Sequence, residues 1–304
     1  MDKRRSSGPK PRPTRLISSL STVNIVILAE NLRKTLGGRE VVNLTFHVEP
    51  GSVTGLVGPN GAGKTVTIKM ISGILRKSSG KLEVFGQDPW NNPRVHERMS
   101  VIFATPFYPR EIKVGELLRD LGKLYGRDPR ELTEEFQLTP HLQKRLNQLS
   151  SGLLQRVQLV ASLMKDPELL VADEPTSNLD PTSRLQFQEI MKRLNGSGVT
   201  ILISSHILSE LERLVSHVIF ISRGEVTFSG RINDVLKGEE EIHLLVDDPE
   251  RALKVLGKGT REGGYLRVMG NFREIVDLLD DAGVKIINSR RASLDEVFKK
   301  FSSA

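Results

Sequence analysis

Gly58-Pro59-Asn60-Gly61-Ala62-Gly63-Lys64-Thr65 is the stretch that decides the fold, because it matches the phosphate-binding loop pattern G-x-x-x-x-G-K-[ST]. An apolar run, Val53 to Val57, precedes it, and a helical pattern, Val66 to Leu75, follows it. Glycines let backbone N–H groups converge on an anion, and the helix start adds partial positive charge. Lys64 supplies a full charge for the outer phosphates, and the Thr65 hydroxyl suits Mg²⁺. The stretch predicts a nucleotide-binding site.

The composition limits the class of protein. The 304 residues allow one large domain or two unequal ones. Five of the seven net positive charges lie in residues 1–22, so the charge gives little support to a nucleic-acid-binding surface. There is no cysteine, which excludes disulfides and thiolate metal sites. No apolar run reaches the roughly 18 residues of a membrane-spanning helix.

Residues 1–22 are rich in proline, serine and basic residues, which predicts a disordered tail. The segment from Leu16 to Ala29, which follows the basic start, superficially resembles the apolar part of an export signal. Serine, threonine and asparagine side chains dilute it, and no small-residue cleavage site stands out, so we do not interpret it as one.

Alternating strand and helix patterns predict an α/β fold with a doubly wound, mostly parallel core sheet. Two alternating segments around Gly37-Gly38 predict an antiparallel edge, and residues of about 104–166 read as an inserted helical subdomain. The strands expected in this part are Asn24–Leu28, Val41–Val48, Val53–Val57, Lys81–Phe85, Met99–Phe103, Leu169–Asp173, Val199–Ile203, Val218–Ile221 and Val226–Phe228.

After Gly238 the pattern changes to a small, self-sufficient α+β unit without a phosphate loop or catalytic pairing. We therefore expect a nucleotide-binding domain over residues 23–237 and an accessory domain over 238–304. The accessory strands are expected at Ile242–Val246, Tyr265–Val268 and Val284–Asn288, and the helices at Pro249–Leu256, Phe272–Ala282 and Ser293–Phe301.

Three polar residues follow the ends of predicted parallel strands, where open α/β sheets bind their ligands. Asp173 ends one strand and can hold Mg²⁺ opposite Thr65, and Glu174 can orient or deprotonate an attacking water. His206 follows the next strand and can reach the γ-phosphate. The alternatives are an ordinary turn carboxylate pair and a histidine at a helix start.

Ser150-Ser151-Gly152 opens a helix that carries an apolar stripe from Leu153 to Met164. Its hydroxyls and free N–H groups suit an anion, although an ordinary helix cap would use the same residues. The segment lies in the helical block and not beside the phosphate loop. The simplest consequence is that it binds the γ-phosphate of a nucleotide held by a second copy. Asp180, before Pro181, reads as another helix cap.

These motifs in this order resemble the nucleotide-binding subunits of ABC transporters over about residues 24–236. The resembling segments are Gly58–Thr65 (Walker A), Leu149–Arg156 (the signature), Leu169–Glu174 (Walker B with its catalytic glutamate), Ser177–Asp180 (the D-loop) and His206 (the switch histidine). The tail ending Ser293-Leu294-Asp295-Glu296-Val297-Phe298 is similar to that of drug- and antibiotic-resistance-type exporters, whose permease is a separate chain.

Several positions depart from the family pattern. Leu36 stands where an aromatic residue commonly stacks on adenine, and Ala104 stands where the Q-loop glutamine is usual. In the signature, Ser151 replaces glycine and Leu153 replaces glutamine, and Val66 replaces a hydroxyl residue after Thr65. We expect changed adenine affinity and weakened coupling, but a working ATPase.

The resemblance implies an ATPase that powers export through a transmembrane permease from the cytoplasmic face of the membrane. It works as a homodimer, or a heterodimer with a related ATPase, that encloses ATP and Mg²⁺, with no specific nucleic acid. The expected ATP contacts are Gly58, Pro59, Asn60, Gly61, Ala62, Gly63, Lys64, Thr65, Val66 and Asp173 of one copy with Ser150, Ser151 and Gly152 of the other. By the same resemblance, Thr65 and Asp173 are expected to hold the metal, and Glu174 and His206 are expected to be catalytic.

Two other functions use part of the same pattern. A soluble ABC-type ATPase acting on ribosomes or nucleic acid usually has two cassettes or a long coiled coil, and this chain has neither; only its basic tail favours that function. A phosphate-loop kinase leaves the signature segment unexplained.

Overall fold

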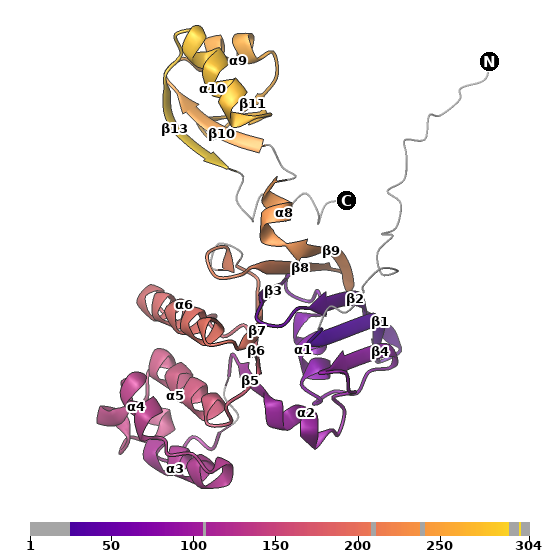
Figure 1. Ribbon diagram of the computed structural model, residues 1–304, viewed down its shortest axis with the longest axis vertical. Coiled ribbons are helices and arrows are strands. Elements are labelled where there is room, and N and C mark those ends of the chain that lie inside the picture. The colour runs from indigo at the N-terminus through magenta and orange to yellow at the C-terminus, as the bar shows by residue number, and fades with distance from the viewer. Residues whose placement is uncertain (1–24, 106–107, 208–210, 238–240, 292–297, 299–304) are drawn as a thin grey trace, which may run out of the picture.

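The computed structural model describes residues 25–105, 108–207, 211–237, 241–291 and 298, drawn in colour in Figure 1. The predicted basic tail and most of the predicted last helix lie outside these residues. A nine-stranded sheet forms the larger part, in the order β4-β1-β2-β9-β8-β3-β7-β6-β5. Its strands are β1 (Ile27–Leu36), β2 (Arg39–Val48), β3 (Val53–Val57), β4 (Ser79–Val84), β5 (Met99–Phe103), β6 (Leu169–Asp173), β7 (Thr200–Ser205), β8 (His217–Ser222) and β9 (Glu225–Arg231).

The predicted α/β sheet is confirmed. Strands β5, β6, β7, β3 and β8 are parallel, whereas β1 pairs antiparallel with β2 and β4 at the edge. The register aligns the carboxyl ends of neighbouring strands, because Val57 pairs with Ser205 and Asp173 pairs with Ser204. The residues that follow β3, β6 and β7 therefore meet at one edge of the sheet.

Helices cover the parallel strands on both faces, which explains why these strands are continuous apolar runs. The side chains of β6 show the division. Leu169 and Val171 join a core with α1, whereas Leu170 and Ala172 join a core with α3, α5 and α6. The helices of this part are α1 (Lys64–Ile71), α2 (Pro93–Arg98), α3 (Val114–Tyr125), α4 (Arg130–Glu135), α5 (Ser151–Leu163), α6 (Pro181–Gly196) and α8 (Ile232–Lys237), with one-turn helices Thr139–His141 and Leu146–Gln148.

A second, four-stranded antiparallel sheet follows α8, in the order β11-β12-β10-β13 (Figure 1). Its own core includes Leu244, Leu266 and Leu279. Its elements are β10 (Glu241–Val246), α9 (Pro249–Leu256), β11 (Thr260–Glu262), β12 (Tyr265–Met269), α10 (Phe272–Asp281) and β13 (Ile286–Arg291). The sequence patterns predict three of these strands and both helices; β11 is additional.

Candidate functional site

The phosphate loop joins β3 to α1 in a conformation that requires glycine. Gly61 and Gly63 have φ angles of 81° and 103°, which side chains rarely adopt. A Cβ atom at Gly58 would lie 2.3 Å from the carbonyl oxygen of Ile221. No side chain caps the N-terminus of α1, so its backbone N–H groups face the loop. This is the backbone arrangement that suits a phosphate group.

Lys64 is buried in this loop, and its ammonium group contacts two backbone carbonyl oxygens and one carboxylate. Its Nζ donates hydrogen bonds to the carbonyl oxygens of Gly58, at 2.7 Å, and Pro59, at 3.2 Å. The same Nζ lies 3.3 Å from Glu174 Oε1. Only 4% of the Lys64 side chain is exposed, so the ion pair with Glu174 is largely shielded from solvent.

Glu174 links the end of β6 to the end of β7. Its Oε2 lies 2.9 Å from Nδ1 of His206, so the carboxylate joins the lysine to the histidine. The backbone of Glu174 has a φ of 45°, which is uncommon for a residue with a side chain. The structure therefore brings three of the expected residues into direct contact, with the carboxylate at the centre.

Ser204 contacts both acidic residues of this edge, and the sequence interpretation missed it. This buried side chain donates a hydrogen bond from its Oγ to Asp173 Oδ1 at 2.7 Å. The same oxygen accepts a hydrogen bond from the backbone N–H of Glu174 at 2.9 Å. One hydroxyl thus orients Asp173 and supports the unusual backbone of Glu174.

Two loop residues have side chains with different surroundings. Thr65 is exposed beside the loop, and its hydroxyl is available to a ligand. Val66 is half-buried and packs against the core around α1, so only its backbone faces the loop. Pro59, Asn60 and Gly61 are exposed, and Ala62 is buried.

The signature segment opens α5, as the sequence predicts. Ser150 is the N-cap, and its Oγ accepts a hydrogen bond from the backbone N–H of Leu153 at 3.3 Å. Ser150 and Ser151 are exposed and Gly152 is buried, with Ser183 Oγ 2.6 Å from the position of a Cβ at Gly152. Within the described residues, the Ser150 side chain forms no hydrogen bond with the phosphate loop.

The D-loop lies between the two carboxylates and α6. Asp180 caps α6 by accepting hydrogen bonds from the Ser183 hydroxyl at 2.6 Å and its backbone N–H at 3.0 Å. These bonds, the hydroxyl first, hold the pKa of Asp180 below its usual value. Asn178 donates from Nδ2 to the carbonyl oxygen of Ala104 at 3.4 Å. A side-chain-to-backbone hydrogen bond thus joins the segment Ser177–Asp180 to the loop that contains Ala104.

Leu36 ends β1, and 44% of its surface is exposed. It presents an apolar surface without the π face of an aromatic ring, and the expected change in adenine affinity stays a prediction.

The comparisons with known proteins agree with this geometry. The ABC transporter family model matches residues 41–177. The Nod factor export ATP-binding protein I of Cupriavidus metallidurans is 31% identical over 295 residues, which are 91% of this chain and 97% of that protein. The chain belongs to the ATP-binding subunits of ABC transporters. Domains of this family bind and hydrolyse ATP, and their subunits typically pair with transmembrane permeases.

Other relatives of the subunit have related names. The NatA ATP-binding protein of Bacillus subtilis is 35% identical over 216 residues, covering 68% of this chain and 87% of that protein. The linearmycin resistance ATP-binding protein LnrL of the same organism is 33% identical over 243 residues, covering 76% and 78%. A solved ATP-binding subunit of an ABC transporter superposes with a TM-score of 0.64 at 28% identity, covering 70% of this chain and 92% of that one.

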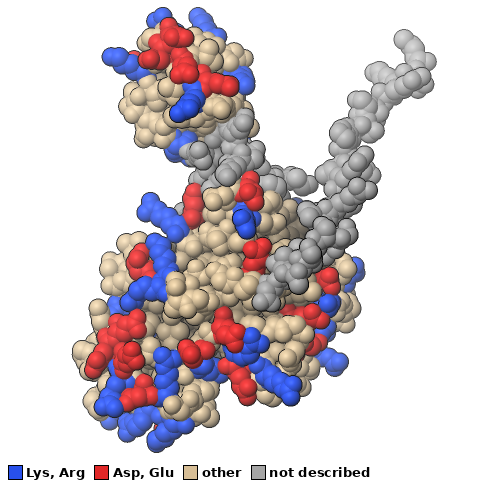
Figure 2. Space-filling view, viewed as in Figure 1, with Lys and Arg blue, Asp and Glu red and all other residues tan. Residues whose placement is uncertain are grey.

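In the described residues, no helix is both long and apolar enough to cross a membrane. On the face drawn in Figure 2, acidic and basic side chains are interspersed over the described surface.

Proposed function

We propose that two copies of this subunit enclose two ATP molecules and power export through a separate transmembrane permease. The observation that carries the proposal is that the residues expected to bind one ATP lie in two separate places on the subunit. Lys64, Glu174 and His206 meet at one sheet edge, while Ser150, at the start of α5, makes no hydrogen bond to them in the described part of the chain. A second copy can complete the site with its own α5. The export and resistance names of the relatives support the direction of transport.

In the proposed complex, the loop from Gly58 to Thr65 holds the phosphates through its backbone N–H groups, and Lys64 neutralises the outer phosphates. The exposed hydroxyl of Thr65 and the carboxylate of Asp173 are oxygen donors of the kind that Mg²⁺ prefers, so these residues fit that ion. Bound Mg²⁺ would neutralise charge that develops on the phosphates. Ser150, Ser151 and Gly152 of the second copy would close the site around the γ-phosphate.

The contacts of Glu174 suggest the order of events in hydrolysis: ATP first engages Lys64, and Glu174 then accepts a proton. Its carboxylate is engaged by Lys64 at 3.3 Å and by His206 at 2.9 Å. When the γ-phosphate takes over Lys64, one carboxylate oxygen becomes available to accept the proton of an attacking water. Water attacks the γ-phosphorus, the bond to ADP breaks, and His206 stabilises the γ-phosphate region.

We also propose the division of the chain into a tail (1–22), a nucleotide-binding domain (23–237) with the helical subdomain of about 104–166, and an accessory domain (238–304). The two separate sheets and their separate cores support this division. A location on the cytoplasmic face of the membrane follows from the proposed permease partner.

The test of the catalytic role is the variant Glu174→Gln, which keeps the shape of the side chain and removes its proton-accepting charge. We expect kcat for ATP hydrolysis to fall by roughly a hundredfold or more, with ATP binding retained. Steady-state phosphate release and equilibrium binding of ATP measure the two effects. Hydrolysis at the rate of the unmodified protein would contradict the role.

A further inference from the structure

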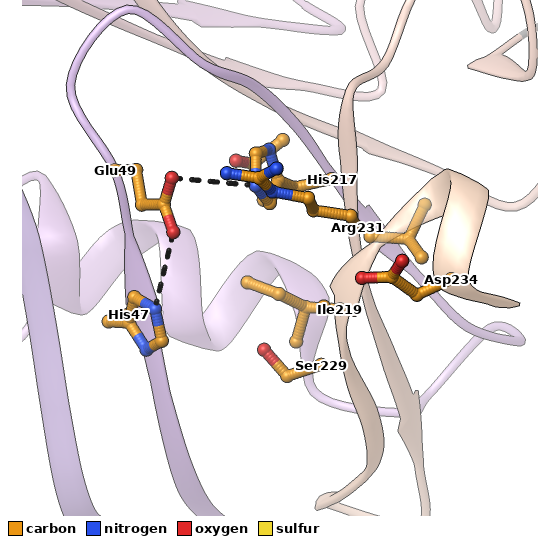
Figure 3. A pocket seen from close by; sticks show the side chains of 10 residues that line it. His47, Glu49, His217, Ile219, Ser229, Arg231 and Asp234 are labelled. Carbon is orange, nitrogen blue, oxygen red and sulfur yellow. Dashed lines mark ion pairs between the residues drawn. The ribbon is translucent and has the colours of Figure 1, made fainter. Parts of the chain in front are cut away.

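The nine-stranded sheet forks at the end opposite the phosphate loop. Strand β2 pairs with β9 only at Asn43 and Glu225, whereas β8 and β9 pair from His217–Arg231 to Ser222–Glu225. Between the diverging strands lies a cavity of about 240 Å³, which we term the sheet-fork cavity (Figure 3). Its polar lining includes His47, Glu49, Thr54, His217, Arg231 and Asp234.

One atom in this cavity lacks a hydrogen-bond partner. Nε2 of His217 is buried and has none in the described part of the chain. It lies 3.6 Å from Glu49 Oε2, which is beyond hydrogen-bond distance. Because buried polar atoms without partners are rare in native proteins, we expect this nitrogen to bind a group from outside the chain.

The surroundings of the ring determine which kind of partner Nε2 needs. Ser216 Oγ donates to the carbonyl oxygen of Val53 and accepts from its N–H, both at 3.2 Å. The hydroxyl has a single proton, which we assign to the bond with Val53; Nδ1 of His217, 3.0 Å from Ser216 Oγ, is then the donor in that contact. In the neutral ring, Nε2 is then an acceptor that faces a carboxylate oxygen. A donor must come between them.

A second imidazole, that of His47, lies on the other side of the carboxylate. Nε2 of His47 lies 3.9 Å from Glu49 Oε1, and Figure 3 shows Glu49 between the two imidazoles. Burial, first among several causes, lowers the pKa of His217, which keeps this ring neutral at neutral pH. Glu49 and Asp234 then outweigh Arg231 by one negative charge. The cavity therefore favours a ligand that donates hydrogen bonds and carries positive charge.

We propose that the sheet-fork cavity binds a small organic molecule through a protonated primary amine, which donates hydrogen bonds to Glu49 and to Nε2 of His217. An ammonium group has three N–H donors and no acceptor, which complements this lining. A single water occupies about 30 Å³ of liquid volume, so the cavity has room for a larger ligand.

Two rivals fit the cavity less well. A metal ion needs converging ligands, and the described residues contain no group of three or more histidine, cysteine or acidic side chains placed to hold one. The two imidazoles approach different oxygens of Glu49, at 3.9 and 3.6 Å. An anion would have to lie beside Glu49 and Asp234.

The test uses the full chain and calorimetric titration with butylammonium chloride as the probe. Butanol and sodium butyrate are the neutral and anionic probes of the same chain length, and zinc chloride tests the metal. We expect saturable binding of butylammonium only. Saturable binding of butyrate or zinc, equal binding of butanol, or no binding of butylammonium would each overturn the proposal.

Glu49→Gln assigns the binding to the cavity, with Glu83→Gln on β4 as the matched control. The two side chains are similarly exposed, 33% for Glu49 and 31% for Glu83. We expect the dissociation constant to rise roughly tenfold in Glu49→Gln, since a charge-assisted hydrogen bond is lost, and to stay unchanged in Glu83→Gln. An unchanged constant in Glu49→Gln would overturn the proposal.

Asp234→Asn, on the exposed face of α8, is the second variant if Glu49→Gln does not fold. Asp234 should contribute less to binding than Glu49 does, so we expect the loss of its charge to raise the dissociation constant of butylammonium by roughly threefold. An unchanged constant in this variant, with Glu49→Gln unfolded, would also overturn the proposal.

Discussion

Among single residues, Ser204 has the strongest unrecognised influence on the site. It sits at the buried end of β7, where its hydroxyl serves two groups at once, the Asp173 carboxylate and the Glu174 backbone. A hydrogen bond to a charged group contributes about 1.5–3 kcal/mol to stability. Removal of the hydroxyl should loosen the Asp173 carboxylate and the Glu174 backbone and leave the fold intact.

Ser204→Ala should therefore lower kcat by roughly tenfold to a hundredfold and raise the Mg²⁺ concentration needed for half-maximal activity. Ser204→Thr keeps the hydroxyl and should restore most of the rate. The measurement is ATP hydrolysis over a Mg²⁺ titration for both variants. A purely structural serine would give equal losses in the two variants, or a changed melting temperature with an unchanged Mg²⁺ dependence.

The sequence predicts the location of the principal residues but not their contacts. Asp173 is the last residue of β6, Glu174 and His206 follow the ends of β6 and β7, and a parallel sheet places such residues at one edge. The ion pair between Lys64 and Glu174 depends on side-chain directions that spacing does not define. A serine at the end of a buried strand has no periodic signal, so Ser204 could not be distinguished from an ordinary core position.

At the scale of elements, the bounds of helices and strands are predicted best where the hydrophobic pattern of the sequence is strongest. Strand β5 matches its predicted bounds because an apolar run marks it, and helix α6 begins at the predicted Asp-Pro cap. Strand β7 extends beyond its predicted end to Ser205, since the last two buried residues are serines with hydrogen-bond partners. Strand β11 has three exposed polar residues and gives no apolar signal.

The start of β8 should make the stability of the protein depend on pH. Burial lowers the folded-state pKa of His217 below its ordinary 6.5, with Glu49 and Asp234 opposing this and Arg231 and His47 adding to it. Below about pH 6.5 the unfolded ring binds a proton before the folded one does, so this contribution to stability is lost as pH falls.

His217→Gln should reduce that loss. The acid-induced loss of stability is measured as the difference in the midpoint of urea unfolding between about pH 7.5 and about pH 5.5. His141→Gln, on a different element, is the control. An equal acid-induced loss in the unmodified protein and in His217→Gln would contradict the assignment.

At the scale of the whole molecule, the chain leaves the larger sheet after α8, forms the second sheet and makes one described contact on its return. Phe298 packs edge-on against Phe220 of β8, with ring centroids 5.2 Å apart and ring planes at 82°. Phe298 also lies against the core that α5 and α6 share with the sheet. Sequence patterns predict both sheets but not this contact, because it joins residues far apart in the chain.

Phe298→Ala should destabilise the larger part by about 2 kcal/mol, less than a fully buried phenylalanine because Phe298 is only half-buried. Phe272→Ala, at an exposed ring of the second sheet's α10, is the control. Denaturant unfolding followed for both variants checks the difference. Equal stability of Phe298→Ala and the unmodified protein would show that the contact does not hold the chain end.

The mass of the Glu174→Gln variant in Mg-ATP tests the central claim that α5 of one copy completes the nucleotide site of another. Light scattering after gel filtration should give twice the subunit mass with Mg-ATP and the single mass without it. Adding Ser150→Arg at the exposed tip of α5 should return the protein to the single mass, whereas adding Ser197→Arg at the end of α6 should not. A strictly monomeric Glu174→Gln variant in Mg-ATP, with and without its permease, would contradict the account.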